Sequence, residues 1–192
     1  MPADLWLIRH GETEWSLSGA HTGRTDLRLT PHGREEAQAI GRYLAGRRFA
    51  LVLTSPLERA RETCALAGYG AAAQPDPNLQ EWDYGEYEGR TTAQIRQLVP
   101  NWSLWRDGVR RGETIDQVAA RADAVIARTK SVAGDVALFA HGHILRVLTA
   151  RWLGLPPQDA RLFALGTATS SVLGYEHQTR VITHWNVACR DR

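Results

Sequence analysis

The sequence predicts an α/β fold built on a mostly parallel, open sheet. Three short apolar runs are typical of buried strands, at residues 5–8, 49–54 and 135–140, and each leads into a polar turn or a helix-start signal. His-Gly follows two of these runs, at residues 10–11 and 141–142. Parallel strands that alternate with helices end at the same edge of a sheet, so this recurrence predicts a ligand site at that edge.

Composition limits the class of protein. The chain has 192 residues, of which 43% are hydrophobic and 23% charged, and we take residues 1–192 as a single domain. The net charge of +2, from 23 basic and 21 acidic residues, is too small to indicate a nucleic acid or a membrane as partner. We recognise no signal peptide and no membrane-spanning run, and expect a cytoplasmic protein. The cysteines, Cys64 and Cys189, predict unpaired thiols.

The first half of the chain contains two helix-start signals. Thr30 before Pro31 is a cap followed by a first-turn proline, and apolar residues at spacings of three and four predict a helix that ends at Gly46. Residues 55–56, Ser-Pro, repeat this pattern and predict a second helix start. Residues 16–25 are polar without periodicity, and we expect a loop whose backbone amides are candidates to hold a ligand's oxygens.

The second half of the chain alternates in the same way. Residues 79–89 are dense in carboxylates, aromatics and glycine, which predicts a rigid functional loop. Residues 101–108 indicate an aromatic turn. Further helices and a closing hairpin are expected at 91–99 with Thr91 or Thr92 as cap, at 114–129, at 144–152, and at 170–175 with 180–185.

Basic and imidazole side chains converge on the predicted carboxyl edge of the sheet. Arg9 and His10 follow the first strand, His141 follows the third, and Arg59 lies near the start of the helix after the second. A guanidinium offers a fork of donors to phosphate oxygens, and a neutral imidazole nitrogen can attack phosphorus. A lone Arg-His pair, or an Arg59–Glu62 pair on a helix surface, would be structural. The convergence of two histidines with two arginines instead favours an anion site.

Four motifs resemble the histidine phosphatase superfamily, which contains cofactor-dependent phosphoglycerate mutases and many phosphatases. They are residues 7–15, 54–60, 79–81 and 140–142. They follow the superfamily's order and spacing over nearly the whole chain. The resemblance implies a three-layer sandwich with helices on both faces of the sheet. Residues 81–89, the Gly-Glu-Thr at 112–114 and the His-Gly-His at 141–143 are most similar to small acid phosphatases and sedoheptulose bisphosphatases.

The resemblance also implies roles for individual residues. His10 would attack the phosphoryl group and become a phosphohistidine, with its second ring nitrogen donating to a backbone carbonyl. Glu81 would be the general acid, and Arg9, Arg59 and His141 would hold the non-bridging oxygens. The candidate substrate-binding residues are Ser16, Thr22, Gly23, Trp82, Tyr84, Gly142 and His143. The superfamily needs no metal, and we expect neither a metal nor a cofactor here.

Departures from the mutase pattern favour hydrolysis over phosphoryl transfer. The departing positions, where the mutases carry asparagine, arginine, lysine and asparagine, are Ser16, Trp82, Thr92 and His143. The long mutase insertion is also absent, unless Arg110 and Arg111 replace its arginine pair. A phosphoglycerate mutase-type phosphotransferase and a non-catalytic module that binds a phosphorylated ligand remain the alternatives.

The expected substrate is a small phosphate ester, such as a sugar phosphate or bisphosphate, rather than a phosphoprotein. Five aromatic residues are candidates either for a sugar-binding wall or for the core: Trp15, Trp82, Tyr84, Trp102 and Trp105. Candidates for binding a second phosphate or a carboxylate are Arg24, Arg106, Arg110 and His143. The oligomeric state is open, with a homodimer as one option.

Overall fold

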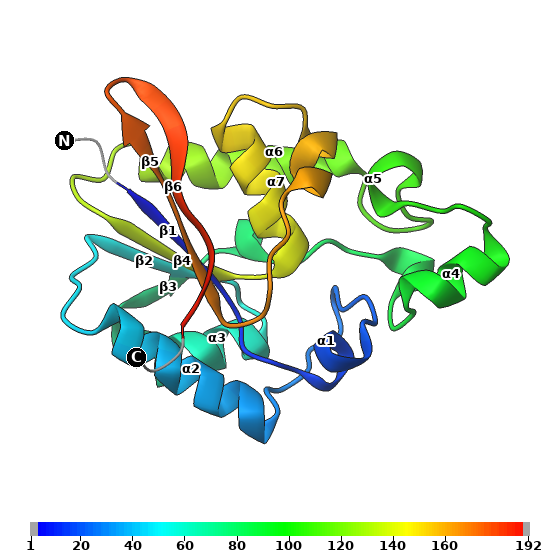
Figure 1. The fold of residues 1–192 in the computed structure, drawn as a ribbon, viewed down its shortest axis with the longest axis horizontal. Coiled ribbons are helices and arrows are strands. Elements are labelled where there is room, and N and C mark those ends of the chain that lie inside the picture. The colour runs from blue at the N-terminus through cyan, green and yellow to red at the C-terminus, as the bar shows by residue number, and fades with distance from the viewer. Residues whose placement is uncertain (1–3, 190–192) are drawn as a thin grey trace.

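The apolar runs form a mixed β-sheet at the centre of the computed structural model, which describes residues 4–189 (Figure 1). In this part of the chain the sheet has the strand order β3-β2-β4-β1-β5-β6. The parallel strands are β1 (Leu5–Arg9), β2 (Leu51–Thr54), β3 (Ala73–Pro75) and β4 (Val136–Ala140). The antiparallel strands, β5 (Thr169–Glu176) and β6 (Thr179–Ala188), form the predicted hairpin at one edge. The mostly parallel sheet is therefore confirmed.

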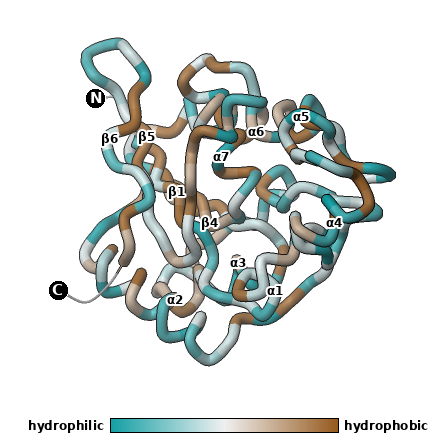
Figure 2. Tube along the Cα trace, turned by 45° about the vertical axis from the view of Figure 1, so that its right-hand side comes forward, coloured by the Kyte–Doolittle hydropathy of each residue, from teal (hydrophilic) through white to brown (hydrophobic). Residues whose placement is uncertain are grey.

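Helices cover both faces of the sheet, which confirms the three-layer sandwich. Side chains alternate along a strand, so one face of β1 and β4 packs against α6 (Ile115–Thr129) and α7 (Gly142–Trp152). The other face packs against α2 (Pro31–Leu44) and α3 (Glu58–Leu66). Figure 1 shows the two helix pairs on opposite sides of the sheet. Figure 2 shows the hydrophobic residues of β1 and β4 at the centre of the molecule.

Short helices complete the fold. The α-helices are α1 (Glu14–Ser18), α4 (Thr92–Leu98) and α5 (Leu104–Asp107), and the 3-10 helices are η1 (Gly70–Ala72), η2 (Pro77–Leu79), η3 (Gly85–Tyr87) and η4 (Pro157–Leu162). Thr30 caps α2 as predicted, and Thr91 rather than Thr92 caps α4. No helix within residues 4–189 has the length and apolar character needed to cross a bilayer.

Two predicted boundaries are wrong for reasons of local hydrogen bonding. Residues 14–18 form α1 instead of a loop, because Thr13 and Ser16 make a reciprocal capping box in which each hydroxyl accepts from the other's amide. Helix α3 begins at Glu58 with Leu57 as its N-cap residue, two residues later than the predicted cap at Ser55. The Ser55 hydroxyl accepts from the Leu57 amide and contacts a histidine of the site, so it does not cap the helix.

The sequence analysis did not predict strand β3 or the 3-10 helix η4. Strand β3 has three residues, all partly or largely exposed, so no apolar run marks it, and it forms only because β2 offers an edge. The 3-10 helix η4 begins at Pro157 in a segment without apolar periodicity. Both are held by tertiary contacts and carry no local signal of their own.

Both cysteines are unpaired, as predicted, and both are buried. Burial raises the pKa of the Cys64 thiol to about 12 and that of Cys189 to about 11. Both thiols are therefore protonated and poorly nucleophilic near neutral pH.

A contact between two glycines holds the turn after β1 against the start of α2. A Cβ atom on Gly11 would lie 2.3 Å from the Gly33 carbonyl oxygen, and one on Gly33 would lie 2.2 Å from the Glu12 carbonyl oxygen. The Gly11 amide also donates to Thr63 Oγ1 of α3 at 3.1 Å. The backbone beside His10 is therefore fixed by α2 and α3 together.

We expect Gly33→Ala to lower the free energy of unfolding by about 1–3 kcal/mol, because the added methyl group overpacks a backbone contact. Helix propensity alone predicts the opposite sign, a gain of about 1 kcal/mol. Urea unfolding followed by circular dichroism measures the change. Gln38→Ala, at an exposed position of the same helix, is the control and should change the value by less than about 0.5 kcal/mol. A Gly33→Ala protein as stable as the wild type would contradict this packing argument.

Candidate active site

His10 lies at the end of β1, between the two strands that flank it. Its amide donates to the Ala140 carbonyl and its carbonyl accepts from the Ala168 amide, both at 3.0 Å. Its buried ring places Nδ1 2.7 Å from the Gly11 carbonyl oxygen. Because a carbonyl oxygen only accepts, Nδ1 carries the proton and Nε2 keeps its lone pair. The expected hydrogen bond from His10 to a backbone carbonyl is confirmed.

Burial and positive charge keep the His10 ring neutral. Burial lowers the pKa of His10 well below 6.5, and the Arg59 and Arg9 guanidinium groups lower it further. The ring of His141 lies 5.1 Å from that of His10, centroid to centroid. Burial, then Arg59, also lowers the pKa of His141 well below 6.5. Two neutral imidazoles therefore lie together beside two arginines.

Arg59 joins the loop after α1 to the second histidine. Its buried guanidinium donates to the carbonyl oxygens of residues 22, 23 and 25 at 3.0–3.1 Å, and its Nε donates to His141 Nδ1 at 3.0 Å. Since His141 Nδ1 accepts, its Nε2 carries the proton and donates to Ser55 Oγ at 2.7 Å. Arg59 thus sets the tautomer of His141 while it holds the loop.

Arg9 lies next to the start of α7. Its Nη1 donates to the Leu165 carbonyl oxygen, and its buried Nε–H has no hydrogen-bond partner among the described residues. A Cβ atom on Gly142 would lie 3.3 Å from Arg9 Cζ, so glycine leaves room for the guanidinium. An unpaired buried donor costs stability. A bound anion would supply the acceptor that the Nε–H lacks.

The Glu81 carboxylate binds the start of α7 from outside the helix. Its Oε2 accepts from the His143 amide and its Oε1 from the Ile144 amide, each at 2.9 Å. The first turn of a helix offers such unpaired N–H groups. Because His141 is the N-cap residue of α7, this arrangement brings Glu81 to the same helix start as the second histidine.

Aromatic and imidazole rings adjoin Glu81. The Tyr84 hydroxyl lies 2.6 Å from His143 Nδ1, and the His143 and Trp105 ring centroids are 5.2 Å apart. His21 packs on Tyr84 with centroids 4.8 Å apart. Arg146, also from α7, places Cζ 4.7 Å over the Trp105 ring. We call Tyr84, His143, Trp105 and His21 the aromatic wall.

The aromatic wall is neutral near pH 7. Burial lowers the pKa of His21 to about 4 and that of His143 well below 6.5. Burial also raises the pKa of Tyr84 well above 10. Within this neutral wall His21, Trp105 and His143 are partly exposed, whereas Tyr84 is buried.

The structure separates the predicted substrate-binding residues. Tyr84, Gly142 and His143 lie around the start of α7, close to Glu81. Trp82 is fully buried, with Nε1 donating to the Glu113 carbonyl oxygen at 2.8 Å, so its side chain supports the loop from behind. Of the other candidate aromatics, Trp102 is buried, and Trp15 and Trp105 are half-buried.

Several polar groups of residues 16–23 make hydrogen bonds within the protein. The Ser16 hydroxyl completes the cap of α1. The Thr22 hydroxyl donates to the Ala20 carbonyl oxygen at 3.3 Å. The Gly23 amide donates to the Glu88 carboxylate at 2.9 and 3.1 Å. This loop is bound to the protein by its amides and carbonyls, in contrast to the predicted set of ligand-holding amides.

Three of the four candidates for a second anion site have partners within the protein. Arg24 donates to Gln80 Oε1 at 2.7 Å and pairs with Asp83 at 3.5 Å. Arg106 pairs with Asp107 at 2.8 Å. Arg110 is exposed, and His143 shares its Nδ1 with Tyr84.

Sequence reasoning missed several residues that adjoin the site: His21, Ser55, Glu88 and Arg146. Ser55 was interpreted as a helix cap, and His21 lies in a segment without a pattern. Arg146 did carry a signal, because it follows His143 by three residues, a spacing that places both on one helix face.

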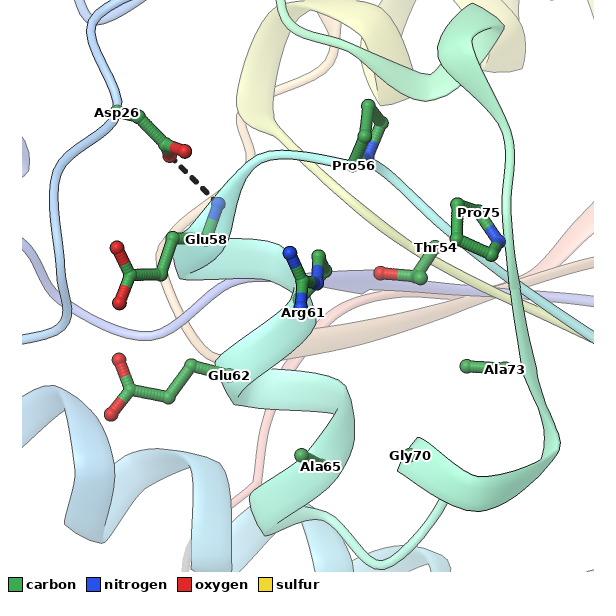
Figure 3. A pocket seen from close by; sticks show the side chains of 10 residues that line it. All are labelled: Asp26, Thr54, Pro56, Glu58, Arg61, Glu62, Ala65, Gly70, Ala73 and Pro75. Carbon is green, nitrogen blue, oxygen red and sulfur yellow. Dashed lines mark hydrogen bonds between the residues drawn. The ribbon is translucent and has the colours of Figure 1, made fainter.

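A separate cavity of about 690 Å³ lies beside the start of α3 (Figure 3). Its lining includes the carboxylates of Asp26, Glu58 and Glu62, and Asp26 accepts from the Glu58 amide at 2.7 Å. Arg61 also lines this cavity, so it points away from the site of Arg59, as its position two residues further along the helix predicts. The surplus of carboxylates makes this cavity unsuited to phosphate.

Fold and site together define an α/β protein with a neutral histidine and two arginines at the carboxyl edge of a parallel sheet. A family profile described as histidine phosphatase superfamily (branch 1) matches residues 5–188. The chain belongs to this superfamily, as its motifs predict.

Individual relatives show the same similarity over most of the chain. An acid phosphatase of Mycobacterium tuberculosis is 41% identical over 180 residues, which cover 92% of this chain and 88% of that protein. A sedoheptulose 1,7-bisphosphatase of Saccharomyces cerevisiae is 36% identical, covering 79% of this chain and 68% of that protein. The solved structure of an open reading frame from Mycobacterium tuberculosis has a TM-score of 0.92 at 38% identity, covering 98% of this chain and 99% of that one.

The low pKa of His21 predicts a stability that falls with pH. In the unfolded chain His21 binds a proton below about pH 6.5, but in the folded protein only near pH 4. Between these values the unfolded state binds more protons, so stability is full above pH 6.5 and is lost as the pH falls. In His21→Phe, the free energy of unfolding should fall less between pH 6.5 and pH 4, by up to about 3 kcal/mol.

Urea unfolding at pH 7, 5.5 and 4.5 measures how steeply the free energy of unfolding depends on pH. His177→Asn, in the exposed turn between β5 and β6, is the control and should keep the wild-type slope. His10, His141 and His143 remain in both variants, so the difference between the variants isolates His21. Equal slopes would show that His21 is protonated in the folded protein over this range.

Proposed function

We propose that this protein is a metal-independent phosphatase that hydrolyses small phosphorylated metabolites through a phosphohistidine on His10. The observation that carries this proposal is the tautomer of His10, whose Nδ1–H donates to the Gly11 carbonyl and leaves Nε2 as a buried, neutral nucleophile. Membership of the superfamily supports the same assignment, as do the relatives named acid phosphatase and sedoheptulose 1,7-bisphosphatase.

In the first step, His10 Nε2 forms a bond to phosphorus while the bond from phosphorus to the ester oxygen breaks. Glu81 enters this step as the acid and gives its proton to the leaving oxygen, which departs as an alcohol. The Arg9 and Arg59 guanidinium groups would supply positive charge and donors to the non-bridging oxygens, and the neutral His141 would donate from Nε2 to one of them in place of Ser55 Oγ. The unpaired Nε–H of Arg9 and the closeness of both arginines to His10 support this role.

In the second step, water attacks phosphorus and the bond from phosphorus to Nε2 breaks. The Glu81 carboxylate takes a proton from this water, and inorganic phosphate leaves. The Nδ1–H of His10 stays on the Gly11 carbonyl throughout. His10 therefore returns to its starting tautomer without a proton exchange at Nδ1.

The aromatic wall beside Glu81 supports a substrate class. Its partly exposed imidazoles and half-buried indole suit a leaving group that carries hydroxyl groups, such as a sugar. We therefore propose a sugar phosphate or sugar bisphosphate. A relative named sedoheptulose 1,7-bisphosphatase supports this class.

Phosphate release tests the function across sugar monophosphates, sugar bisphosphates, phosphoglycerates and p-nitrophenyl phosphate with no metal added. We expect release by the wild type, and a loss of at least about 1,000-fold in kcat/KM for His10→Ala because the nucleophile is gone. An alkaline quench followed by mass spectrometry should find a phosphoryl group on the peptide that contains His10. His177→Asn controls for loss of an arbitrary histidine.

Other outcomes of this experiment identify the alternatives. Exchange between phosphoglycerates without phosphate release would make the protein a mutase. The absence of both activities, with tight binding of phosphate esters, would make it a binding module.

The pH profile tests the neutral nucleophile. Protonation of Nε2 removes the attacking lone pair, and the lowered pKa of His10 moves this loss to lower pH. We expect kcat/KM, corrected for ionisation of the substrate, to show no acid limb centred near pH 6.5. Rates on p-nitrophenyl phosphate from pH 4 to 8 measure this. An acid limb at 6.5 that belongs to His10 would contradict the assignment.

A further inference from the structure

A partly buried arginine on α6 holds the loop that carries Glu81. Arg121 Nη1 donates to the carbonyl oxygens of Asn78 and Gln80 at 2.8 and 2.7 Å. Its Nη2 lies 3.5 Å from the Glu81 carbonyl oxygen. One guanidinium therefore contacts the backbone of the general acid and of the residues just before it.

Glu113 holds Arg121 in place and binds the other side of the same loop. Both Glu113 carboxylate oxygens accept from Arg121, from Nε and from Nη2, each at 2.8 Å. The two side chains expose only 16% and 15% of their surfaces. The Glu113 carboxylate also accepts from the Asp83 amide at 3.0 Å, and the Glu113 backbone carbonyl accepts from Trp82 Nε1 at 2.8 Å. The pair thus secures the backbone on both sides of residue 81.

The Glu81 carboxylate has hydrogen bonds of its own, one of them from the Trp82 amide of the same loop at 3.0 Å. Its oxygens accept from the His143 and Ile144 amides of α7, whereas the Glu81 backbone is bound by Arg121 of α6, which Glu113 holds from just before that helix. A bidentate pair between guanidinium and carboxylate has a narrow geometry. With both ends held, Glu81 keeps one position at the start of α7.

We infer that Arg121 and Glu113 are positioning residues that set Glu81 for proton transfer to the leaving oxygen. This inference rests on the proposed function. Neither residue contacts a reacting group in this scheme, and both act through the backbone of residues 78–83. Without Arg121, the carboxylate keeps its bonds to α7 while the backbone behind it is released.

Leaving groups of different basicity separate this role from a merely structural one. A strongly basic leaving oxygen needs a proton as its bond breaks, whereas a weakly basic one does not. We would measure kcat/KM on glycerol phosphate and on 2,4-dinitrophenyl phosphate for the wild type, Arg121→Met, Arg121→Lys, Glu113→Gln and Glu81→Gln.

We expect Arg121→Met to lose about 100-fold on glycerol phosphate, because a displacement of about 1 Å has this effect on a catalytic group. On 2,4-dinitrophenyl phosphate the loss should be under about threefold, since this leaving group needs no acid. Arg121→Lys keeps the charge but cannot reproduce the fork of donors. We therefore expect Arg121→Lys and Glu113→Gln to show the same selectivity, in smaller degree.

Arg151→Met is the matched control. Arg151 also makes a bidentate pair with a carboxylate of α6, at 3.0–3.2 Å to Asp123, but its hydrogen bonds reach no residue of the loop 78–83. Any change that Arg151→Met causes in kcat/KM should be the same factor on both substrates. The inhibition constant of inorganic phosphate reports the pocket around His10 and should be unchanged in Arg121→Met.

The outcomes distinguish this inference from the proposed function. Selective loss in Glu81→Gln, with equal loss on both substrates in every Arg121 and Glu113 variant that folds, would overturn the positioning role alone. Equal loss on both substrates in Glu81→Gln would overturn the acid role of Glu81 and the positioning role with it. If Arg121→Met does not fold, Arg121→Lys and Glu113→Gln decide the question.

Discussion

The hydrogen bond from His10 Nδ1 to the Gly11 carbonyl is the constraint on which the site depends. It joins neighbouring residues, so it forms only if the backbone turns sharply after β1. The contact between Gly11 and Gly33 and the bond from the Gly11 amide to Thr63 hold that turn. The packing of α2 and α3 against the sheet therefore decides which His10 nitrogen carries a lone pair, and with it the chemistry that the ring can perform.

Backbone groups assemble most of this site. Amides at the start of α7 hold Glu81, carbonyl oxygens of residues 22, 23 and 25 hold Arg59, and carbonyl oxygens of residues 78 and 80 accept from Arg121. Such contacts connect α3, α6 and α7 to two loops that are distant in sequence. Because the contacts tie side chains to the frame of the protein, the positions of the reacting groups follow from the packing of the helices on the sheet.

Local sequence signals predicted the elements that have their own hydrogen-bonding or apolar pattern. Thr30 and Pro31 marked α2, and the apolar runs marked β1, β2 and β4. The signals failed where a short element depends on its neighbours. Strand β3 needs the edge of β2, and the Ser55 hydroxyl contacts His141 instead of capping α3. Helix α1 is short enough that its capping box, rather than any periodicity, defines it.

The sequence by itself determined the family, the sheet and the identity of the groups that converge at its carboxyl edge, because strand ends and helix starts are local features. Only the tertiary structure decided the tautomers of His10 and His141, the burial of Trp82 and the neutral state of His21. These properties depend on which atoms lie within hydrogen-bonding distance and on how much water is excluded. Both are set by segments far apart along the chain, and no single stretch of sequence records them.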